Sequence, residues 1–176
     1  MECLINFNRH SSATLDRLIG CQIKKVEIAR DLSQTAPKGL LAHAVYLWTD
    51  RGVFCVYGEA YRGLPLHDFA SISMAEVSTD ELSEDKLLRE KIDEIDGKNQ
   101  SLKFTGILYR RDMYAGTSSL INREMAVEYV CGLIFLFGET PISVLASSIE
   151  PSLEVLTTES EFSELLDQFI RVEPAW

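Results

Sequence analysis

The sequence predicts an α+β fold in which a mostly antiparallel sheet is accompanied by two main helices and a short helix near the N-terminus. Two observations lead to this prediction. Runs of β-branched and aromatic residues come in pairs separated by short glycine-containing turns, which is typical of β-hairpins. Three other segments place apolar residues at helical spacing beside a capping residue or a glycine stop.

The length and composition indicate one domain over residues 1–176. Of the 176 residues, 46% are hydrophobic and 25% are charged, which is the composition of a soluble globular protein. A chain of this size buries about 70% of its unfolded surface on folding. Two sheet segments, about 20–75 and 101–157, have a similar pattern, which suggests an internal duplication.

The first predicted elements are a short helix over Ser11–Gly20 and a strand over Gln22–Ala29. The helix has a Ser or Thr available as N-cap, an apolar side with Leu15 and Leu18, and Gly20 as its stop. The strand mixes apolar residues with charges, which favours a half-exposed position in the sheet.

Two hairpins are predicted, at residues 42–57 and 133–146. Asp50-Arg51-Gly52 supplies the first turn and Gly138 the second. Pro141 lacks an N–H donor, so it belongs at this second turn or at the start of the returning strand. Further strands are expected over residues 101–110 and 123–130. The apolar stretch around the second hairpin contains charges, glycines and a proline, so a membrane-spanning helix is not expected.

The two main helices are predicted at about 83–96 and 158–170. The first has apolar residues at helical spacing and is followed by Gly97. These apolar residues are Leu87, Leu88, Ile92 and Ile95. The second begins with Thr158 and Glu161 in the register of a capping box and continues with an apolar face.

The net charge of −10 is concentrated in two segments. Residues 76–96 hold nine acidic and three basic residues, and residues 150–176 hold seven acidic and one basic, so each segment carries −6. Such a field repels phosphate backbones and attracts a basic protein partner. An acidic surface that serves solubility alone is the open alternative. The candidate partner-binding residues are Glu84, Asp85, Asp93, Glu94, Glu159, Glu161, Glu164 and Tyr61.

No motif for catalysis, a metal ion or a cofactor stands out. The four cysteines form no C-x-x-C pair and are expected as reduced, buried thiols. His67 has no accompanying G-x-S-x-G nucleophile motif, and the loop at Tyr114 lacks the lysine of a phosphate-binding loop. The alternative is a small enzyme or ligand-binding protein with a pocket near His67, Tyr61 and Tyr114.

Aromatic residues could also anchor an interface, since tryptophan and tyrosine are frequent in binding hot spots. Trp48 and Tyr57 lie in predicted strands, so core packing is favoured for Trp48, whereas Tyr61 and the terminal Trp176 are further interface candidates. The first residues show no basic stretch followed by an apolar run, and we therefore expect a cytoplasmic protein.

The whole chain resembles the small acidic immunity proteins that accompany bacterial polymorphic or contact-dependent toxins. The resemblance rests on the G-x-x-I of Gly20–Ile23 opening a strand, the hairpin GLIFLFGETPISVLASS, the acidic Glu150–Glu164 segment after it, and the lack of catalytic groups. It implies a cytoplasmic inhibitor that blocks a toxin domain by stoichiometric binding, without enzymatic activity.

Overall fold

The computed structural model describes residues 2–5, 8–30, 40–64, 67–84, 88–91, 100–115, 124–138, 140–147, 152–158, 163 and 171–174. The described helices are α1 (Arg9–Leu18) and α2 (Thr79–Glu84). The strands are β1 (Glu2–Ile5), β2 (Gln22–Arg30), β3 (Leu40–Ala42), β4 (Ala44–Thr49), β5 (Val53–Leu64), β6 (His67–Val77), β7 (Leu88–Lys91), β8 (Gln100–Ala115), β9 (Glu124–Phe137), β10 (Thr140–Ala146), β11 (Leu153–Leu156) and β12 (Arg171–Pro174). The fold is mostly antiparallel sheet, as predicted, with less helix than expected.

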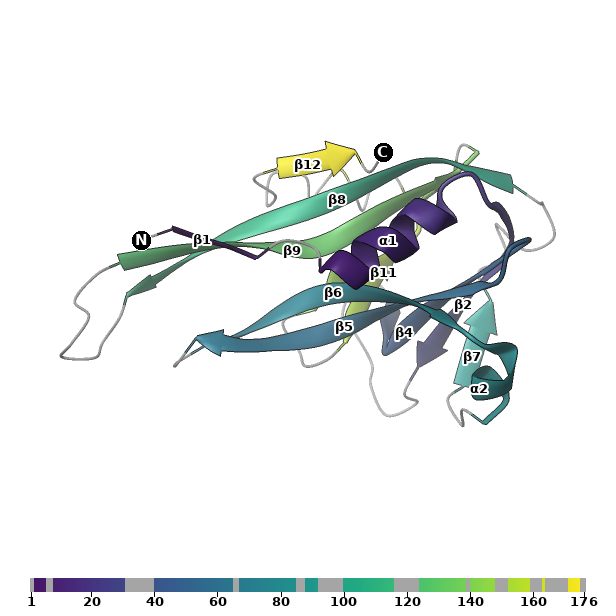
Figure 1. Cartoon of the computed structure of the whole chain (residues 1–176), viewed down its shortest axis with the longest axis horizontal. Coiled ribbons are helices and arrows are strands. Elements are labelled where there is room, and N and C mark those ends of the chain that lie inside the picture. Colours follow the sequence, from purple (N-terminus) through teal and green to yellow (C-terminus); the bar gives the residue numbers. More distant parts are fainter. Residues whose placement is uncertain are drawn as a thin grey trace.

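The twelve strands form one sheet whose main path runs β3-β11-β10-β9-β8-β2-β4-β5-β6 (Figure 1). Described neighbours pair antiparallel except β1 and β9, which are parallel. Only His43 separates β3, which pairs with β11, from β4, which pairs with β2. The His43 amide donates to the Ala29 carbonyl at 2.8 Å, so hydrogen bonding to β2 continues through this residue. The sheet therefore closes on itself through one bent strand, β3–β4.

The main core fills the inside of this curved sheet. It combines Leu15 and Leu18 of α1 with alternate residues of the strands, such as Val45 and Leu47 of β4. Because side chains alternate across a strand, the intervening residues of β4 face the other side. Those residues, Ala44 and Tyr46, belong to a second cluster, which also includes Leu82 of α2.

The helix α1 covers the outer edge of β6, the last strand of the main path (Figure 1). The buried Ser11 hydroxyl accepts from the Met74 amide at 2.8 Å and donates to the Met74 carbonyl at 3.3 Å. Asn8 caps the helix by accepting from the Ser11 amide at 2.7 Å, and its side-chain amide donates to Ser73 Oγ at 3.0 Å. Side chains of α1 thus satisfy some of the backbone hydrogen-bonding groups at the outer edge of β6.

The two predicted hairpins are confirmed. The β4–β5 hairpin turns through Asp50-Arg51-Gly52, where the Thr49 amide donates to the Gly52 carbonyl at 2.9 Å. The β9–β10 hairpin pairs Phe137 with Thr140, and Gly138 stands in the turn with a φ of 63°. This positive φ is accessible to glycine at little cost, which explains the residue type. Pro141 is the second residue of the returning strand.

The predicted strand over 123–130 and the first strand of the second hairpin are a single strand, β9. Gly132 lies in its middle and not in a turn. A Cβ built on Gly132 would stand 2.6 Å from Leu145 Cδ2 and 2.9 Å from Leu108 Cδ1. A side chain at this position would have to displace these leucine side chains, which approach from the two neighbouring strands.

The predicted helix at 83–96 is wrong. Leu88–Lys91 forms β7 and pairs antiparallel with Glu27–Arg30 of β2. The strand β8 pairs with β2 only at Gln22 and Ile23. The strand β7 therefore satisfies the backbone N–H and C=O groups farther along the same edge of β2. Pairing in the sheet overrides the helical spacing of the leucines and isoleucines. The other predicted core positions of that helix, Leu87, Ile92 and Ile95, lie outside the described residues.

The short helix α2 precedes β7 and begins with a capping box. Ser78 Oγ accepts from the Glu81 amide at 3.2 Å, and Glu81 Oε2 accepts from the Ser78 amide at 3.0 Å. These reciprocal bonds satisfy two backbone donors at the helix start. The sequence Ser78-x-x-Glu81 matches the capping-box pattern, but the predicted helix began several residues later, at about residue 83.

The predicted set of helices is therefore not matched. The N-terminal helix begins at Arg9, with Asn8 and not a Ser or Thr as its N-cap, and it is the longest helix among the described residues. Residues 158–170 lie outside the described part of the chain except for Thr158 and Ser163. No helix in the described ranges is long and apolar enough to cross a membrane.

The two similar segments contribute to one sheet. The strands β2, β4, β5 and β6 are consecutive in the main path, and so are β8, β9, β10 and β11. Each group is an antiparallel series, and β2 pairs with β8 where the groups meet. Whether the two segments share an origin stays a prediction.

Candidate functional site

The candidate site lies on the face of β2, β4 and β5 that points away from the main core. We call its apolar part the outer-face cluster. It consists of Ala29, Ala44, Tyr46, Val53, Cys55 and Leu82, with Trp48, Tyr57 and Val77 packed against it. Trp48 and Tyr57 are partly exposed, whereas Tyr46 is buried. An aromatic surface that is anchored at one end and reachable at the other is suited to contact a partner.

Trp48 is held in place by two side chains of β2. Its indole N–H donates to Glu27 Oε2 at 2.7 Å. The Lys25 ammonium lies 4.0 Å from the centroid of the Trp48 rings and donates to Glu27 Oε1 at 2.6 Å. We call these three residues the Trp48 triad. The cation thus lies against both an aromatic face and a carboxylate.

The sheet register explains why the Trp48 triad forms. Lys25 pairs with Trp48 across β2 and β4, and Glu27 pairs with Tyr46. Lys25 and Glu27 are two residues apart, so both project from the same face of β2. Glu27 is largely buried, with 9% of its side chain exposed against 26% for Lys25. The buried carboxylate therefore has both of its oxygens bonded, which a buried charge requires.

A second cation packs beside the triad. The Arg89 guanidinium of β7 lies 5.3 Å from the centroid of the Tyr46 ring and also donates to the carbonyl of Leu82 in α2. Arg89 therefore joins β7, β4 and the end of α2. Because it is engaged on two sides, this arginine has a structural role in fixing α2 over the outer-face cluster.

A polar network lies at the other end of the same face. Ser73 Oγ donates to the Glu59 carboxylate while it accepts from Asn8, the N-cap of α1. Tyr57 pairs with Ser73 across β5 and β6. Burial raises the pKa of the Tyr57 hydroxyl above its ordinary value, the nearby Glu59 charge and Cys55 raise it further, and a hydrogen bond with Ser73 lowers it. This network connects the start of α1 to the β5–β6 hairpin.

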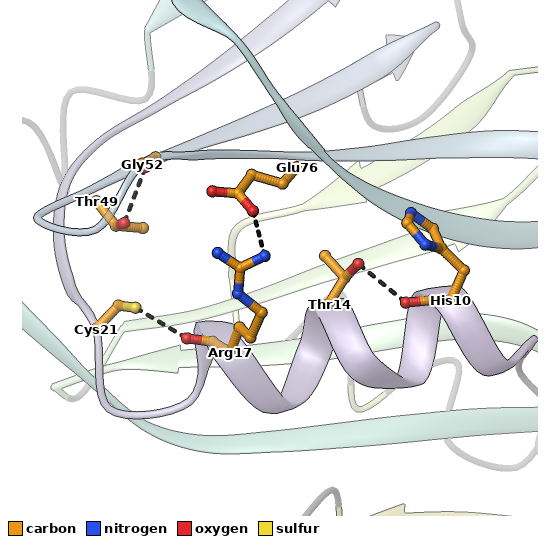
Figure 2. Close-up of polar contacts among 7 residues, drawn as sticks. All are labelled: His10, Thr14, Arg17, Cys21, Thr49, Gly52 and Glu76. Atoms are coloured by element: carbon orange, nitrogen blue, oxygen red, sulfur yellow. Dashed lines mark hydrogen bonds and ion pairs between the residues drawn. The ribbon is translucent and has the colours of Figure 1, made fainter.

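The C-terminal end of α1 lies near the β4–β5 turn (Figure 2). Figure 2 shows Arg17 of α1 pointing to Glu76 of β6, with which it forms an ion pair. The Thr14 hydroxyl donates to the His10 carbonyl at 2.9 Å, so this contact uses the backbone of His10 and not its imidazole. The Arg17–Glu76 ion pair joins α1 to β6, whereas the Thr14–His10 bond lies within the helix.

The structure describes few of the predicted partner-binding residues. Glu84 is the last residue of α2, and Tyr61 lies in β5 opposite Phe69; nothing further is described of their side chains. The remaining six lie outside the described residues: Asp85, Asp93, Glu94, Glu159, Glu161 and Glu164. The premise that both acidic segments are helical is wrong for the first, because residues 76–96 include the end of β6, α2 and β7.

The residues of the predicted alternative pocket lie in three strands. His67 begins β6 opposite Leu64, close in sequence to Tyr61 of β5, and Tyr114 is near the end of β8 opposite Met125. The β5–β6 hairpin and the end of β8 are on the same side of the molecule in Figure 1. The structure describes only the backbone of Tyr61, His67 and Tyr114.

The prediction that the cysteines are buried is confirmed for the three whose side chains the structure describes. Cys21, Cys55 and Cys131 are buried and form no disulfide. Cys21 Sγ donates to the Arg17 carbonyl at 3.2 Å (Figure 2). In the described part of the chain, no three side chains of His, Cys, Asp or Glu are grouped as they would be around a metal ion.

Sequence reasoning missed the Trp48 triad. It favoured core packing for Trp48 and predicted a half-exposed strand for the charged residues of β2. The available signal was the Lys25-Val26-Glu27 alternation, which places opposite charges on one face of a strand. That face could be matched to Trp48 only once the register of β2 against β4 was known.

Comparisons with known proteins identify no relative: no family model matches the chain, and neither the curated proteins nor the solved structures contain a significant match.

Proposed function

We propose that this protein is a non-catalytic, cytoplasmic protein-binding domain, and more specifically an immunity-type inhibitor that neutralises a toxin domain by stoichiometric binding. The observation that carries the proposal is the Trp48 triad. A partly exposed tryptophan is fixed by a hydrogen bond to a buried carboxylate and by a cation over its ring.

Such a residue is suited to anchor an interface. Binding hot spots are enriched in tryptophan, tyrosine and arginine, and they are surrounded by contacts that exclude water. A side chain that is already fixed loses little conformational freedom on binding, which favours affinity. Tyr57 lies on the same face and enlarges the aromatic surface.

The net charge of −10 supports a basic partner, because a field of this sign increases the rate at which positively charged proteins associate. In this proposal the acidic residues named from the sequence form the rim of the contact and mainly set the association rate. The Trp48 triad, in contrast, sets the dissociation rate. The two contributions are separable because only the first depends strongly on salt.

The proposal is tested with the product of the gene that lies next to this one in its host, which it predicts to be a toxin domain. The purified domain and this protein are mixed, and the stoichiometry and Kd are measured by calorimetry. Trp48→Ala should weaken binding by about 30-fold or more, the loss expected of a hot-spot residue. Arg51→Ala is the matched control, because Arg51 is exposed in the β4–β5 turn and should change the Kd little.

The same variants are then compared in cells that express the toxin domain. Protection by the wild type and by Arg51→Ala, with loss of protection by a folded Trp48→Ala, would support the proposal. A neighbouring gene product that binds with equal affinity to all three proteins would exclude Trp48 as the anchor. A neighbouring gene product that does not bind at all would contradict the inhibitor function.

A further inference from the structure

We infer that the Trp48 ring and the Glu27 carboxylate form a binding site for an arginine side chain of the partner protein, and that Lys25 fills this site in the free protein. The inference rests on the proposed function and specifies the chemistry of its contact. It concerns the Trp48 triad, in which the cation is supplied by the chain itself.

The geometry is that of a cation-recognition site. A positive group is placed 4.0 Å from an aromatic centroid and 2.6 Å from a carboxylate oxygen. An aromatic face attracts a cation through its quadrupole, and this attraction increases when the contact is shielded from water. The low exposure of Glu27 shields the carboxylate side of this contact.

The two oxygens of Glu27 have different roles. Oε2 is bonded to the indole N–H of Trp48, and Oε1 is bonded to the Lys25 ammonium. If Lys25 leaves, the first bond remains, so the aromatic face and the carboxylate keep their relative positions. The site is therefore still formed when its cation is exchanged.

Lys25 is the more readily exchanged of the two cations on this face. Its ammonium is on a flexible stem and 26% of its side chain is exposed. Arg89, in contrast, is bonded to the Leu82 carbonyl and connects three elements. A guanidinium is more weakly hydrated than an ammonium and stacks better on aromatic rings, so an incoming arginine should compete well with Lys25.

The charge of the whole protein favours an incoming cation. The net charge of −10 attracts basic groups to the surface, whereas the local charge of Lys25 opposes their final approach. Removing Lys25 should therefore increase the affinity of the Trp48 site for a free guanidinium compound. This increase distinguishes a binding site from an ion pair that only stabilises the sheet.

The test uses the full-length protein and N-acetyl-arginine methylamide as the probe. Binding is followed by the NMR signal of the Trp48 indole N–H, which is assigned with a Trp48→Phe variant. Lys25→Ala should bind the probe at least about tenfold more tightly than the wild type, the factor that a shielded cation–π contact supplies. Lys24→Ala is the matched control, because it removes the same charge from the neighbouring, exposed residue.

Two further variants complete the test. Lys25→Gln keeps a donor for Glu27 and replaces Lys25→Ala if that variant does not fold. Adding Glu27→Gln to either one should abolish the gain in affinity, since the carboxylate is lost while a hydrogen-bond acceptor for Trp48 remains. Equal probe affinity in the Lys25 and Lys24 variants, or a gain that survives Glu27→Gln, would overturn the inference.

The probe titration needs no partner. A failure here leaves the proposed interface through Trp48 standing, with a different chemistry of contact. A failure of the toxin experiment, in turn, does not alter the result of the titration. The two proposals can therefore be rejected independently.

Discussion

Ser11→Ala should destabilise the protein, because the Ser11 hydroxyl satisfies the backbone of Met74 at the outer edge of β6. The Ser11 side chain is fully buried, so water cannot replace it. The bond from the Met74 amide is 2.8 Å long, and the bond to the Met74 carbonyl is longer, at 3.3 Å. Most of the loss should therefore come from the amide.

The expected loss follows from two opposing contributions. Leaving a buried N–H without a partner costs about 1 to 3 kcal/mol. Alanine is a better helix former than serine, so the substitution also stabilises the helix by about 0.5 kcal/mol. The net loss of about 0.5 to 2.5 kcal/mol should lower the Tm by about 1 to 10 °C for a chain of this size.

The assay is urea unfolding of Ser11→Ala beside Ser12→Ala, which removes a hydroxyl from the next position of the same helix and is only half-buried. Hydrogen exchange at the Met74 amide reports on the bond itself. The reasoning is refuted if the two variants unfold at the same urea concentration and the Met74 amide keeps its protection.

Two further outcomes are expected. Gly132→Ala should lower the free energy of unfolding by about 1 to 3 kcal/mol, because the new Cβ would press on Leu108 and Leu145; unchanged or increased stability in urea would show that these side chains yield freely. Burial, Glu59 and Cys55 raise the pKa of Tyr57 above 10.0, so the unfolded chain releases this proton first; the stability that Tyr57 contributes is present below pH 10 and is lost as the pH rises above it. From pH 9 to 11, a range around the ordinary tyrosine pKa of about 10, the stability of the wild type should fall more steeply than that of Tyr57→Phe. An equal fall in the two proteins would contradict the raised pKa of Tyr57.

The features that the sequence predicted correctly depend on neighbouring residues. The β4–β5 and β9–β10 hairpins are determined by their turns, where Gly52 and Gly138 follow apolar runs. The end of α1 is equally local: the helix ends at Leu18, Ile19 is its C-cap, and Gly20 follows with a φ of 78°. In each case a residue type and its nearest neighbours decide the backbone conformation.

The features that were missed depend on distant residues. The apolar residues around Leu88 have helical spacing, but Leu88–Lys91 forms a strand that pairs with β2. This pairing is possible because β8 pairs with β2 only at Gln22 and Ile23. The space at Gly132 is limited by Leu108 and Leu145 of the neighbouring strands. The Trp48 triad likewise requires the register between β2 and β4. No local pattern contains these relationships.

The bent strand β3–β4 has a consequence for how the chain folds during synthesis. Ala42 of β3 pairs with Leu153 of β11, so the sheet can close only after β11 has left the ribosome. Until then, the edges of β3 and β10 that β11 will occupy have no partner strand. Contacts between residues so distant in sequence slow folding, and exposed strand edges promote aggregation. We therefore expect nascent chains that stop before β11 to aggregate more readily than chains that include it.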